Sequence, residues 1–288
     1  MERVKSKYEK LLSCKQCQPI KPVMKTKFLY IEYGHQKTYV DELTYSLATL
    51  FDYHSLLKSD VLVYTENTET YAHLPVTAVS VAQDMPAYSL NGAYHFRVKP
   101  CVMKRALQEH GQDANIVFLD TDTYFKKNIN PYLGQINAQH ALMNKFEKRN
   151  PYPDEVLPPV QLPSGKIYAY DEQHAIMYNS GLVGLHASHA ACLDDAIAII
   201  DAMVSASFKA HTIEQCAVSE AFRIHQIQLA ELYKEVEHYW PSTDKKYMRR
   251  QLAGLAASGV QANGLPAGRI KHSWLRARLH KLPGFHQS

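Results

Sequence analysis

The chain has 288 residues, of which 46% are hydrophobic, 21% charged and 10% aromatic. This composition is typical of a folded globular protein and excludes both wholesale disorder and collagen-like repeats. No stretch approaches the roughly 20 apolar residues that a membrane-spanning helix needs, and the N-terminal residues lack the apolar core of a secretory signal. We therefore expect the protein to remain in the cytoplasm.

The net charge of +4 is divided unevenly along the chain. Nine basic residues and one acidic residue follow Trp240, so the last 48 residues carry +8 and the preceding 240 residues carry −4. A basic end on an acidic body indicates an anionic partner at that end.

The hydrophobic pattern predicts strands that alternate with helices in the first half of the chain. The predicted elements are, in order, a strand at 28–33, a helix at 41–53, strands at 61–64 and 76–81, a helix at 101–109 and a strand at 115–119. Such alternation is typical of the α/β class, in which a mostly parallel sheet is flanked by helices. We expect a single domain at 26–250, preceded by a polar leader at 1–25 and followed by a basic helical tail at 251–288.

The pattern changes in the second half of the chain. Residues 151–165 hold five of the fourteen prolines, which predicts an irregular loop, and loops of that length are commonly lids or binding loops. Residues 176–185 are predicted to form two short strands separated by a break at Asn179-Ser180-Gly181. A helix is expected over 190–206, and another is expected to begin at Thr212.

Five cysteines in a chain expected in the cytoplasm argue against a disulfide framework. Cys14 and Cys17 form a single CxxC without a second pair, which favours reduced thiols over a zinc site. Cys101, Cys192 and Cys216 fall in helical patterns, so we expect them in the core.

Asp120 and Asp122 directly follow the predicted strand at 115–119. Open α/β sheets bind ligands at the carboxyl ends of their strands. Two carboxylates at the end of a buried strand are costly unless they are neutralised, and a divalent cation with substrate phosphates would neutralise them. Because Asp is also common in turns, a simple strand-exit turn is the alternative explanation.

The run from Phe118 to Phe125 resembles the DxD motif of nucleotide-sugar glycosyltransferases with the GT-A fold, a Rossmann-like fold with a mixed, mostly parallel sheet. Tyr30-Ile-Glu-Tyr33 resembles the first, nucleotide-contacting strand of that family. The segment His95-Phe-Arg97-Val-Lys99 resembles the basic segment that meets the sugar diphosphate. Asn179-Ser180-Gly181 resembles the acceptor-side turn of the family.

Two later segments extend the resemblance over roughly residues 26–250. Glu214-Gln215 resembles the Asp-Gln pair of retaining family 8 enzymes, with Glu in place of Asp. His238-Tyr239-Trp240, followed by Lys245 and Lys246, is similar to the segment that supplies a third metal ligand and a phosphate contact.

The resemblance implies a metal-dependent glycosyltransferase that moves a sugar from a nucleotide diphosphate sugar, with a UDP-sugar as the first choice, to a glycan or a lipid-linked acceptor. It implies Mn²⁺ or Mg²⁺ held by Asp120, Asp122 and His238, and the imidazole favours Mn²⁺. His272 is the other candidate for the third ligand. The implied donor-binding residues are Tyr33, Arg97, Lys99, Asp120, Thr121, Asp122 and Lys245. The implied catalytic residues are Glu214 and Gln215, and the implied acceptor-side residues are Asn179 and Ser180.

Several of these residues also have structural explanations. Arg97 and Lys99 could lie together on the solvated face of a strand. Gln215 could complete a helix capping box with Thr212. Asn179 could accommodate a left-handed turn before Gly181.

The stereochemical outcome stays open at this point. Inversion needs a carboxylate base beside the acceptor hydroxyl, for which Asp171, Glu172 and Glu214 are candidates. Retention needs a polar group on the other face of the sugar, and the resemblance points to Gln215 for that role.

In the tail, residues 268–288, Leu275, Leu279 and Leu282 recur at helical spacing among basic residues. A basic amphipathic helix suits an anionic membrane surface and would place the protein on the inner face of the membrane. A helix packed on the core with a solvated face is the other interpretation. No recognition motif for nucleic acid accompanies the charge, so we expect no nucleic-acid partner.

Two other functions compete with sugar transfer. Phosphatases of the haloacid dehalogenase type also place a DxD after an apolar strand, but they have Thr or Val where this chain has Tyr124, and their DxD normally ends the first strand of the core. A catalytically silent module that binds glycan or membrane is the second alternative, and the intact Asp120, Asp122 and His238 argue against it.

Overall fold

The computed structural model describes residues 24–34, 36–257, 259–261 and 263–272. The CxxC of Cys14 and Cys17 and the predicted amphipathic helix of the tail lie outside these residues. No helix of the described part is long and apolar enough to cross a membrane. The boundaries of the three predicted regions stay a prediction.

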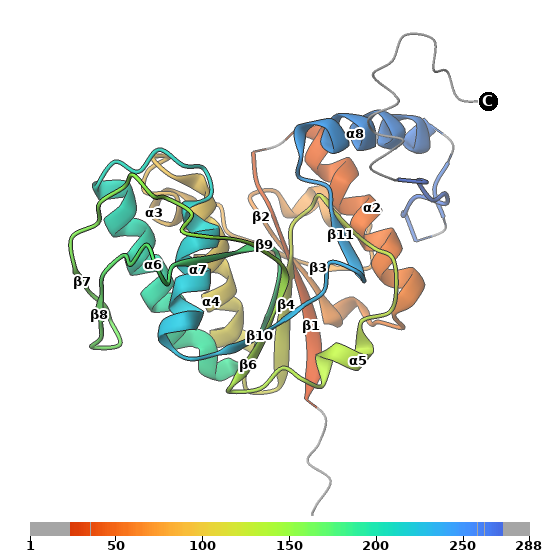
Figure 1. The fold of residues 1–288 in the computed structure, drawn as a ribbon. Helices are drawn as coiled ribbons and strands as arrows, with labels where there is room; N and C mark the ends of the chain where they lie inside the picture. The colour runs from red at the N-terminus through yellow and green to blue at the C-terminus, as the bar shows by residue number, and fades with distance from the viewer. Residues whose placement is uncertain (1–23, 35, 258, 262, 273–288) are drawn as a thin grey trace, which may run out of the picture.

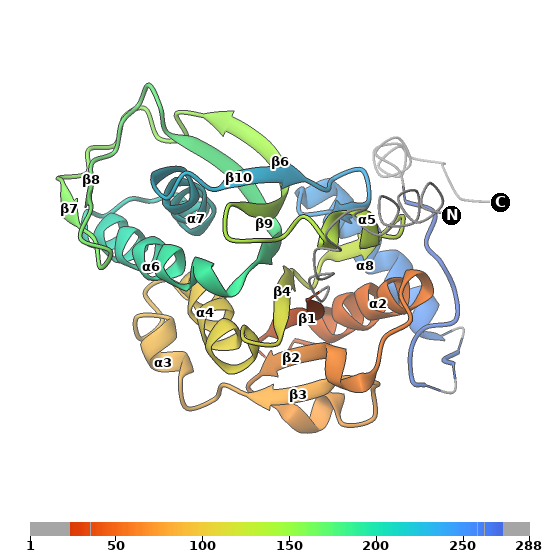
Figure 2. The ribbon, with the colours of Figure 1, turned by 90° about the horizontal axis from the view of Figure 1, so that it is seen from below.

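A seven-stranded sheet runs through the centre of the molecule (Figures 1 and 2). Its order is β10 (Gln228–Glu231), β6 (His140–Arg149), β9 (Ile176–Leu185), β4 (Ala114–Leu119), β1 (Lys25–Glu32), β2 (Val61–Thr65) and β3 (Thr77–Ser80). Among these strands β9 alone runs antiparallel to both of its neighbours, β4 and β6, whereas the remaining pairs are parallel. The predicted mixed, mostly parallel sheet is confirmed.

Helices cover both faces of the sheet. On one face lies α2 (Lys37–Tyr53), against which α8 (Ser242–Ala257) packs, and on the other lie α4 (Val98–His110), α6 (Ala190–Ser205) and α7 (Ile213–Ile224) (Figure 1). Alternate residues of β1 divide between the two cores: Leu29 packs toward α4 and α7, and Tyr30 packs toward α2. This alternation is what a strand buried on both faces requires, and it explains the continuous apolar run in the sequence.

Two small antiparallel ribbons complete the described strands: β5 (Thr123–Phe125) with β11 (Val236–His238), and β7 (Val160–Gln161) with β8 (Ile167–Tyr168). The short helices are α3 (Met85–Tyr88) and α5 (Asn130–Leu133), with 3-10 turns η1 (Lys58–Asp60), η2 (Thr68–Tyr71), η3 (His95–Arg97) and η4 (Ala187–His189). The β5–β11 ribbon matters most for function because it pairs His238 with Thr123, directly after Asp122.

The expectation of two strands at 176–185 is wrong, because β9 continues through the Asn-Ser-Gly sequence. Asn179 pairs with Lys145 of β6 and does not have a positive φ, so the left-handed turn at Asn179 is also wrong. Gly181 allows the ring of His238 to pack closely against the backbone of β9, because a Cβ at this position would lie 2.2 Å from Nδ1 of His238. The apparent turn signal is therefore a packing requirement.

The proline-rich segment at 151–165 is irregular apart from β7, as predicted. Its apolar side chains Tyr152, Leu157 and Leu162 are buried in a cluster with residues of α6 and α7, and none of the segment lines the main cavity. Cys101, Cys192 and Cys216 are buried, which confirms the prediction that they lie in the core.

Asp195 of α6 fixes this segment to the helical layer. The carboxylate is fully buried and accepts hydrogen bonds from the Ser164 backbone N–H (3.0 Å) and the Ser164 hydroxyl (2.6 Å), and it lies 2.7 Å from Nε2 of His225. Burial alone would raise the pKa of the Asp195 carboxyl, but the hydrogen bonds from Ser164 and His225 bring that pKa below its ordinary value.

Replacing this carboxylate should destabilise the fold in a pH-dependent way. We expect Asp195→Asn to lower the free energy of unfolding at pH 7 by about 1–3 kcal/mol, because buried donors lose a charged acceptor. A carboxyl with a lowered pKa stabilises the fold above its unfolded-state pKa of about 3.9 and loses that contribution as the pH falls further. Urea unfolding should therefore show a smaller difference from the parent protein at about pH 3.5 than at pH 7. Asp113→Asn, at an exposed position, is the control, and equal stability of the two variants at pH 7 would contradict the prediction.

Candidate active site

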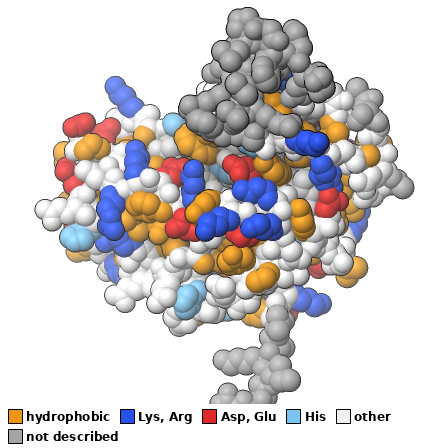
Figure 3. All heavy atoms as spheres, turned by 45° about the vertical axis from the view of Figure 1, so that its right-hand side comes forward, with side chains coloured by type: hydrophobic (Ala, Val, Ile, Leu, Met, Phe, Trp, Pro, Cys, Tyr) orange, Lys and Arg blue, Asp and Glu red, His pale blue; other side chains and the backbone are white. Residues whose placement is uncertain are grey.

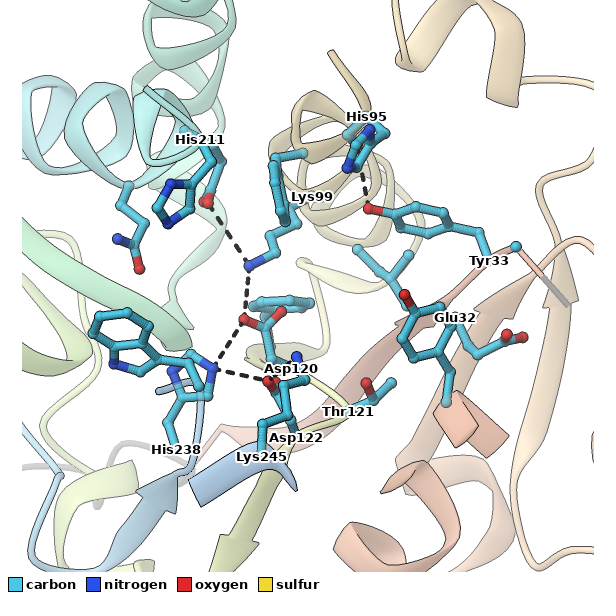
Figure 4. A pocket seen from close by; sticks show the side chains of 18 of the residues that line it. Glu32, Tyr33, His95, Lys99, Asp120, Thr121, Asp122, His211, His238 and Lys245 are labelled. Atoms are coloured by element: carbon cyan, nitrogen blue, oxygen red, sulfur yellow. Dashed lines mark hydrogen bonds and ion pairs between the residues drawn. The ribbon is translucent and has the colours of Figure 1, made fainter. Parts of the chain in front are cut away.

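One cavity of about 580 Å³ lies at the carboxyl ends of β1 and β4, within the range of roughly 300–1,000 Å³ that is usual for ligand sites (Figure 4). Its lining residues are Ile31, Glu32, Tyr33, Gly34, Gln36, Tyr39, His95, Phe96, Lys99, Phe118, Asp120, Thr121, Asp122, His211, Thr212, Glu214, Gln215, His238, Trp240 and Lys245. They come from β1, η3, α4, the β4–β5 turn, α7, β11 and α8, so the cavity forms only when distant parts of the chain meet.

Asp120, Asp122 and His238 converge at the floor of the cavity. One ligand atom from each lies within 4.8 Å of the other two, and no other such group of three occurs among the described residues. Nε2 of His238 is 3.2 Å from Oδ1 of Asp122 and 3.7 Å from Oδ2 of Asp120. The other ring nitrogen, Nδ1, is 2.7 Å from Oδ1 of Asn179, which fixes the ring with Nε2 toward the carboxylates.

This donor set fits a divalent cation. Two carboxylates and one imidazole are ligands that Mn²⁺ accepts, and Mg²⁺ accepts the carboxylates. His272, the other candidate for the third ligand, lies elsewhere: its Nδ1 is 3.0 Å from the Tyr124 hydroxyl and its Nε2 is 3.0 Å from Oδ1 of Asp244. The geometry therefore assembles the group with His238.

Two lysines neutralise the two aspartates. Nζ of Lys99 is 2.7 Å from Oδ2 of Asp120, and Nζ of Lys245 is 2.7 Å from Oδ2 of Asp122 (Figure 4). Burial would raise the pKa of Asp122, but the contacts with His238 and with the Lys245 ammonium group hold that pKa well below its usual range. Burial would likewise lower the pKa of Lys99, and the charges of Asp120 and Glu214 raise it above the ordinary lysine value. Asp122 is thus ionised, as a carboxylate that binds a metal must be.

Glu214 and Gln215, in the first turn of α7, meet β9 at the cavity wall. Glu214 accepts a hydrogen bond from the Ser180 hydroxyl (2.9 Å), and its other oxygen, Oε1, has no hydrogen-bond partner among the described residues. Burial raises the pKa of Glu214 to about 7, against the opposing charge of Lys99. Oε1 of Gln215 accepts from the Ser180 backbone N–H (3.2 Å).

The predicted capping box is wrong, because Gln215 bonds to β9 and the Thr212 side chain does not cap α7. The Thr212 hydroxyl lies 2.9 Å from the hydroxyl of Tyr152. Gln215 is therefore held in the cavity wall by tertiary contacts.

Asn179 and Ser180 lie behind the cavity wall and do not line the cavity. Asn179 is 1% exposed; its amide nitrogen donates to Glu147 (2.9 Å) and its oxygen accepts from the backbone of Gly181 (3.0 Å). Both side chains orient site residues: Asn179 orients His238, and Ser180 orients Glu214.

Arg97 and Lys99 do not share a strand face, because Lys99 belongs to the first turn of α4 and Arg97 to η3. Lys99 points into the cavity. Arg97 does not line it; Nη2 of Arg97 pairs with Asp201 (2.9 Å) of α6, and Nη1 donates to the Ala87 carbonyl (3.0 Å). Tyr33 and Thr121 do line the cavity, and the Tyr33 hydroxyl donates to the carbonyl of His95 (3.4 Å).

The exposed Asp171 pairs with His174 at 2.6 Å, and neither Asp171 nor Glu172 lines the cavity. Of the three carboxylates considered as a base, only Glu214 is at the site. Five lining residues lie outside every segment predicted to form the site, namely Gly34, Gln36, Tyr39, His211 and Thr212, and Trp240 lies inside such a segment but had no predicted role. Trp240 had a signal, since it is one of only two tryptophans and lies two residues after His238.

No protein-family model matches this sequence, and no curated protein matches it. Among solved structures, the chain is similar to mouse xyloside xylosyltransferase 1 in its apo form. The identity is 14% and the TM-score 0.47, and the likeness covers 72% of this chain and 85% of that chain.

Gly181→Ala should disturb the candidate metal site without disturbing the sheet. The added Cβ would lie 2.2 Å from Nδ1 of His238, so the ring must move away from Asn179 and the aspartates. We expect Mn²⁺ binding, measured by electron paramagnetic resonance, to weaken about tenfold or more. Gly134→Ala is the matched control, because a Cβ there meets nothing within 4 Å. Parental Mn²⁺ affinity in Gly181→Ala would contradict the role assigned to His238.

Proposed function

We propose that the protein is a metal-dependent glycosyltransferase that moves a sugar from a nucleoside diphosphate sugar to an acceptor hydroxyl. One observation carries the proposal: Asp120, Asp122 and His238 converge beside Lys99 and Lys245 in a single cavity at the carboxyl end of β4. Carboxylates for a cation and ammonium groups for phosphate oxygens are what a diphosphate leaving group requires.

Charge neutralisation is the main chemical task of such a site. A nucleoside diphosphate leaves poorly until the negative charge that grows on its phosphate is stabilised. A divalent cation held by Asp120, Asp122 and His238 would act there as a Lewis acid. Lys245, whose side chain remains 31% exposed, is placed to reach a phosphate oxygen at the same point.

The reaction breaks the bond between the anomeric carbon and the β-phosphate oxygen, and the electron pair stays on the phosphate. The acceptor oxygen forms the new bond to the anomeric carbon and loses its proton. Glu214 is suited to receive that proton, because its Oε1 is unpartnered and a pKa near 7 matches neutral conditions. Gln215, fixed by Ser180, offers an amide group beside it, and retention through that group is the alternative course.

Finer assignments follow from the sequence resemblance and belong to the same proposal. The donor is a UDP-sugar, the cation is Mn²⁺ in preference to Mg²⁺, and the acceptor is a glycan or a lipid-linked acceptor. The protein works in the cytoplasm, and residues 268–288 attach it to the anionic inner face of the membrane.

Asp122→Ala tests the metal mechanism. Thermal-shift measurements should show that UDP raises Tm only with Mn²⁺, by the equivalent of about 2.7 kcal/mol at a ligand concentration of 100 times Kd. In Asp122→Ala we expect this shift and sugar transfer to be abolished, because a ligand and its bound cation are lost together. Asp154→Ala, at an exposed aspartate outside the cavity, should behave like the parent. A UDP-dependent shift that survives EDTA would refute the mechanism.

Glu214→Gln tests the proton acceptor. The substitution keeps the shape of the side chain and removes its basicity, so transfer should fall by about 100-fold or more. The Mn²⁺-dependent shift with UDP should persist. Glu172→Gln, at an exposed carboxylate that does not line the cavity, is the control, and near-parental transfer by Glu214→Gln would exclude this role.

A further inference from the structure

Trp240 is a large aromatic side chain that lines the cavity and is nevertheless 43% exposed. No described residue forms a hydrogen bond or a ring contact with its side chain. By contrast, the preceding residue, Tyr239, is 1% exposed and packs in a cluster with Tyr45 and Tyr124. An indole without partners at a cavity wall leaves both an apolar face and an N–H donor available to a ligand.

The backbone that carries this indole is firmly anchored. His238 is held through Nδ1 by Asn179, and its strand β11 pairs with β5. Tyr239 donates its backbone N–H to the Asp122 carbonyl (3.1 Å). Because both preceding residues are fixed, the backbone that carries the indole is held in place, and ordering of that backbone adds little to the entropy cost of ligand binding.

Trp240 lies two residues after His238 in the chain, and His238 is on the side of the two aspartates away from β1. His238 and Gln215 are both tied to adjacent residues of β9, Asn179 and Ser180 respectively. Figure 4 places His211 and His238 on one side of the two aspartates and Glu32 and Tyr33 on the other. The β1 side has its own aromatic residues in the cavity wall, Tyr33 and Tyr39, so a nucleobase can stack there without Trp240.

We propose that Trp240 is the stacking platform for the acceptor, and that the acceptor group bound there is a sugar ring. This inference rests on the proposed function and adds the chemical class of the second substrate. A sugar ring has an apolar face for the indole and hydroxyls for hydrogen bonds, and His211, Thr212 and Gln215 line the same cavity. These neighbours are polar, so the surroundings suit a glycan better than an alkyl chain.

The sequence offers a direct reporter. The chain has two tryptophans, so Trp274→Phe leaves Trp240 as the single indole. This variant is titrated with lactose, maltose and diacetylchitobiose in the presence of Mn²⁺ and UDP, and its fluorescence is followed. We expect a saturable change of emission with at least one saccharide and little change with UDP and Mn²⁺ alone. A full change on UDP alone would assign the indole to the nucleobase, and an emission that no saccharide alters would also overturn the inference.

Two substitutions connect this signal to turnover. With the saccharide that responds as acceptor, Trp240→Ala should raise its KM by about tenfold, because the sugar loses the apolar surface on which it stacks. Trp240→Phe should recover most of the loss. Tyr233→Ala, which removes an equally exposed aromatic outside the cavity, is the control. An unchanged KM in Trp240→Ala contradicts the inference.

The nucleotide assay separates the two levels of the proposal. If UDP and Mn²⁺ do not shift the Tm of the parent protein, the proposed function fails. If they shift it equally in the parent and in Trp240→Ala while the saccharide signal is absent, only the role of Trp240 fails.

Discussion

Compensation of two neighbouring carboxylates, Asp122 buried and Asp120 partly buried, is the constraint on which the rest of the site depends. Asp120 and Asp122 end a fully buried strand, where uncompensated charge is costly. The compensating groups come from three separate elements: Lys99 from α4, His238 from β11 and Lys245 from α8. The two helical layers and the β5–β11 ribbon are thereby joined electrostatically at one point, which is also where the cavity opens.

The C-terminal part of the described chain supports this point from behind. Arg249 of α8 pairs with the fully buried Glu42 of α2 (2.8 Å), and the backbone of Ile270 donates to the Tyr45 hydroxyl (2.9 Å). His272 then joins Tyr124 to Asp244 beneath the turn of the aspartates. On the face shown in Figure 3, acidic and basic side chains lie close to one another. The described residues on this face therefore do not form a patch of a single charge sign that would attract a charged partner.

Hydrophobic periodicity along the chain predicts most of the strands and helices, whereas part of the site depends on contacts between distant residues. The strand before Asp120 and two helices have clear periods, so the sequence alone predicts them, the helices at 41–53 and 190–206 against 37–53 and 190–205 in the structure. The course of β9 depends on pairing with β6 and on the approach of His238 to Gly181, which are contacts between distant residues. One interpretation of the sequence places Arg97 and Lys99 on one face of a strand, where residues two apart point the same way. They lie instead at the start of a helix, where residues two apart point in different directions.

The ion pairs of Lys99 and Lys245 with the two aspartates also bear on how a cation would bind at this site. Both aspartates already hold an ammonium group at 2.7 Å, so a divalent cation would not enter an open negative cavity. It would exchange with the lysine ammonium groups, and the displaced groups would need new anionic partners to remain near the cavity floor. Lys99 has Glu214 at 3.7 Å for that purpose, whereas among the described residues Lys245 has no second carboxylate within 4.0 Å and only the more distant charge of Glu42. The affinity for a cation would therefore depend on the positions open to the Lys99 and Lys245 side chains as well as on Asp120, Asp122 and His238.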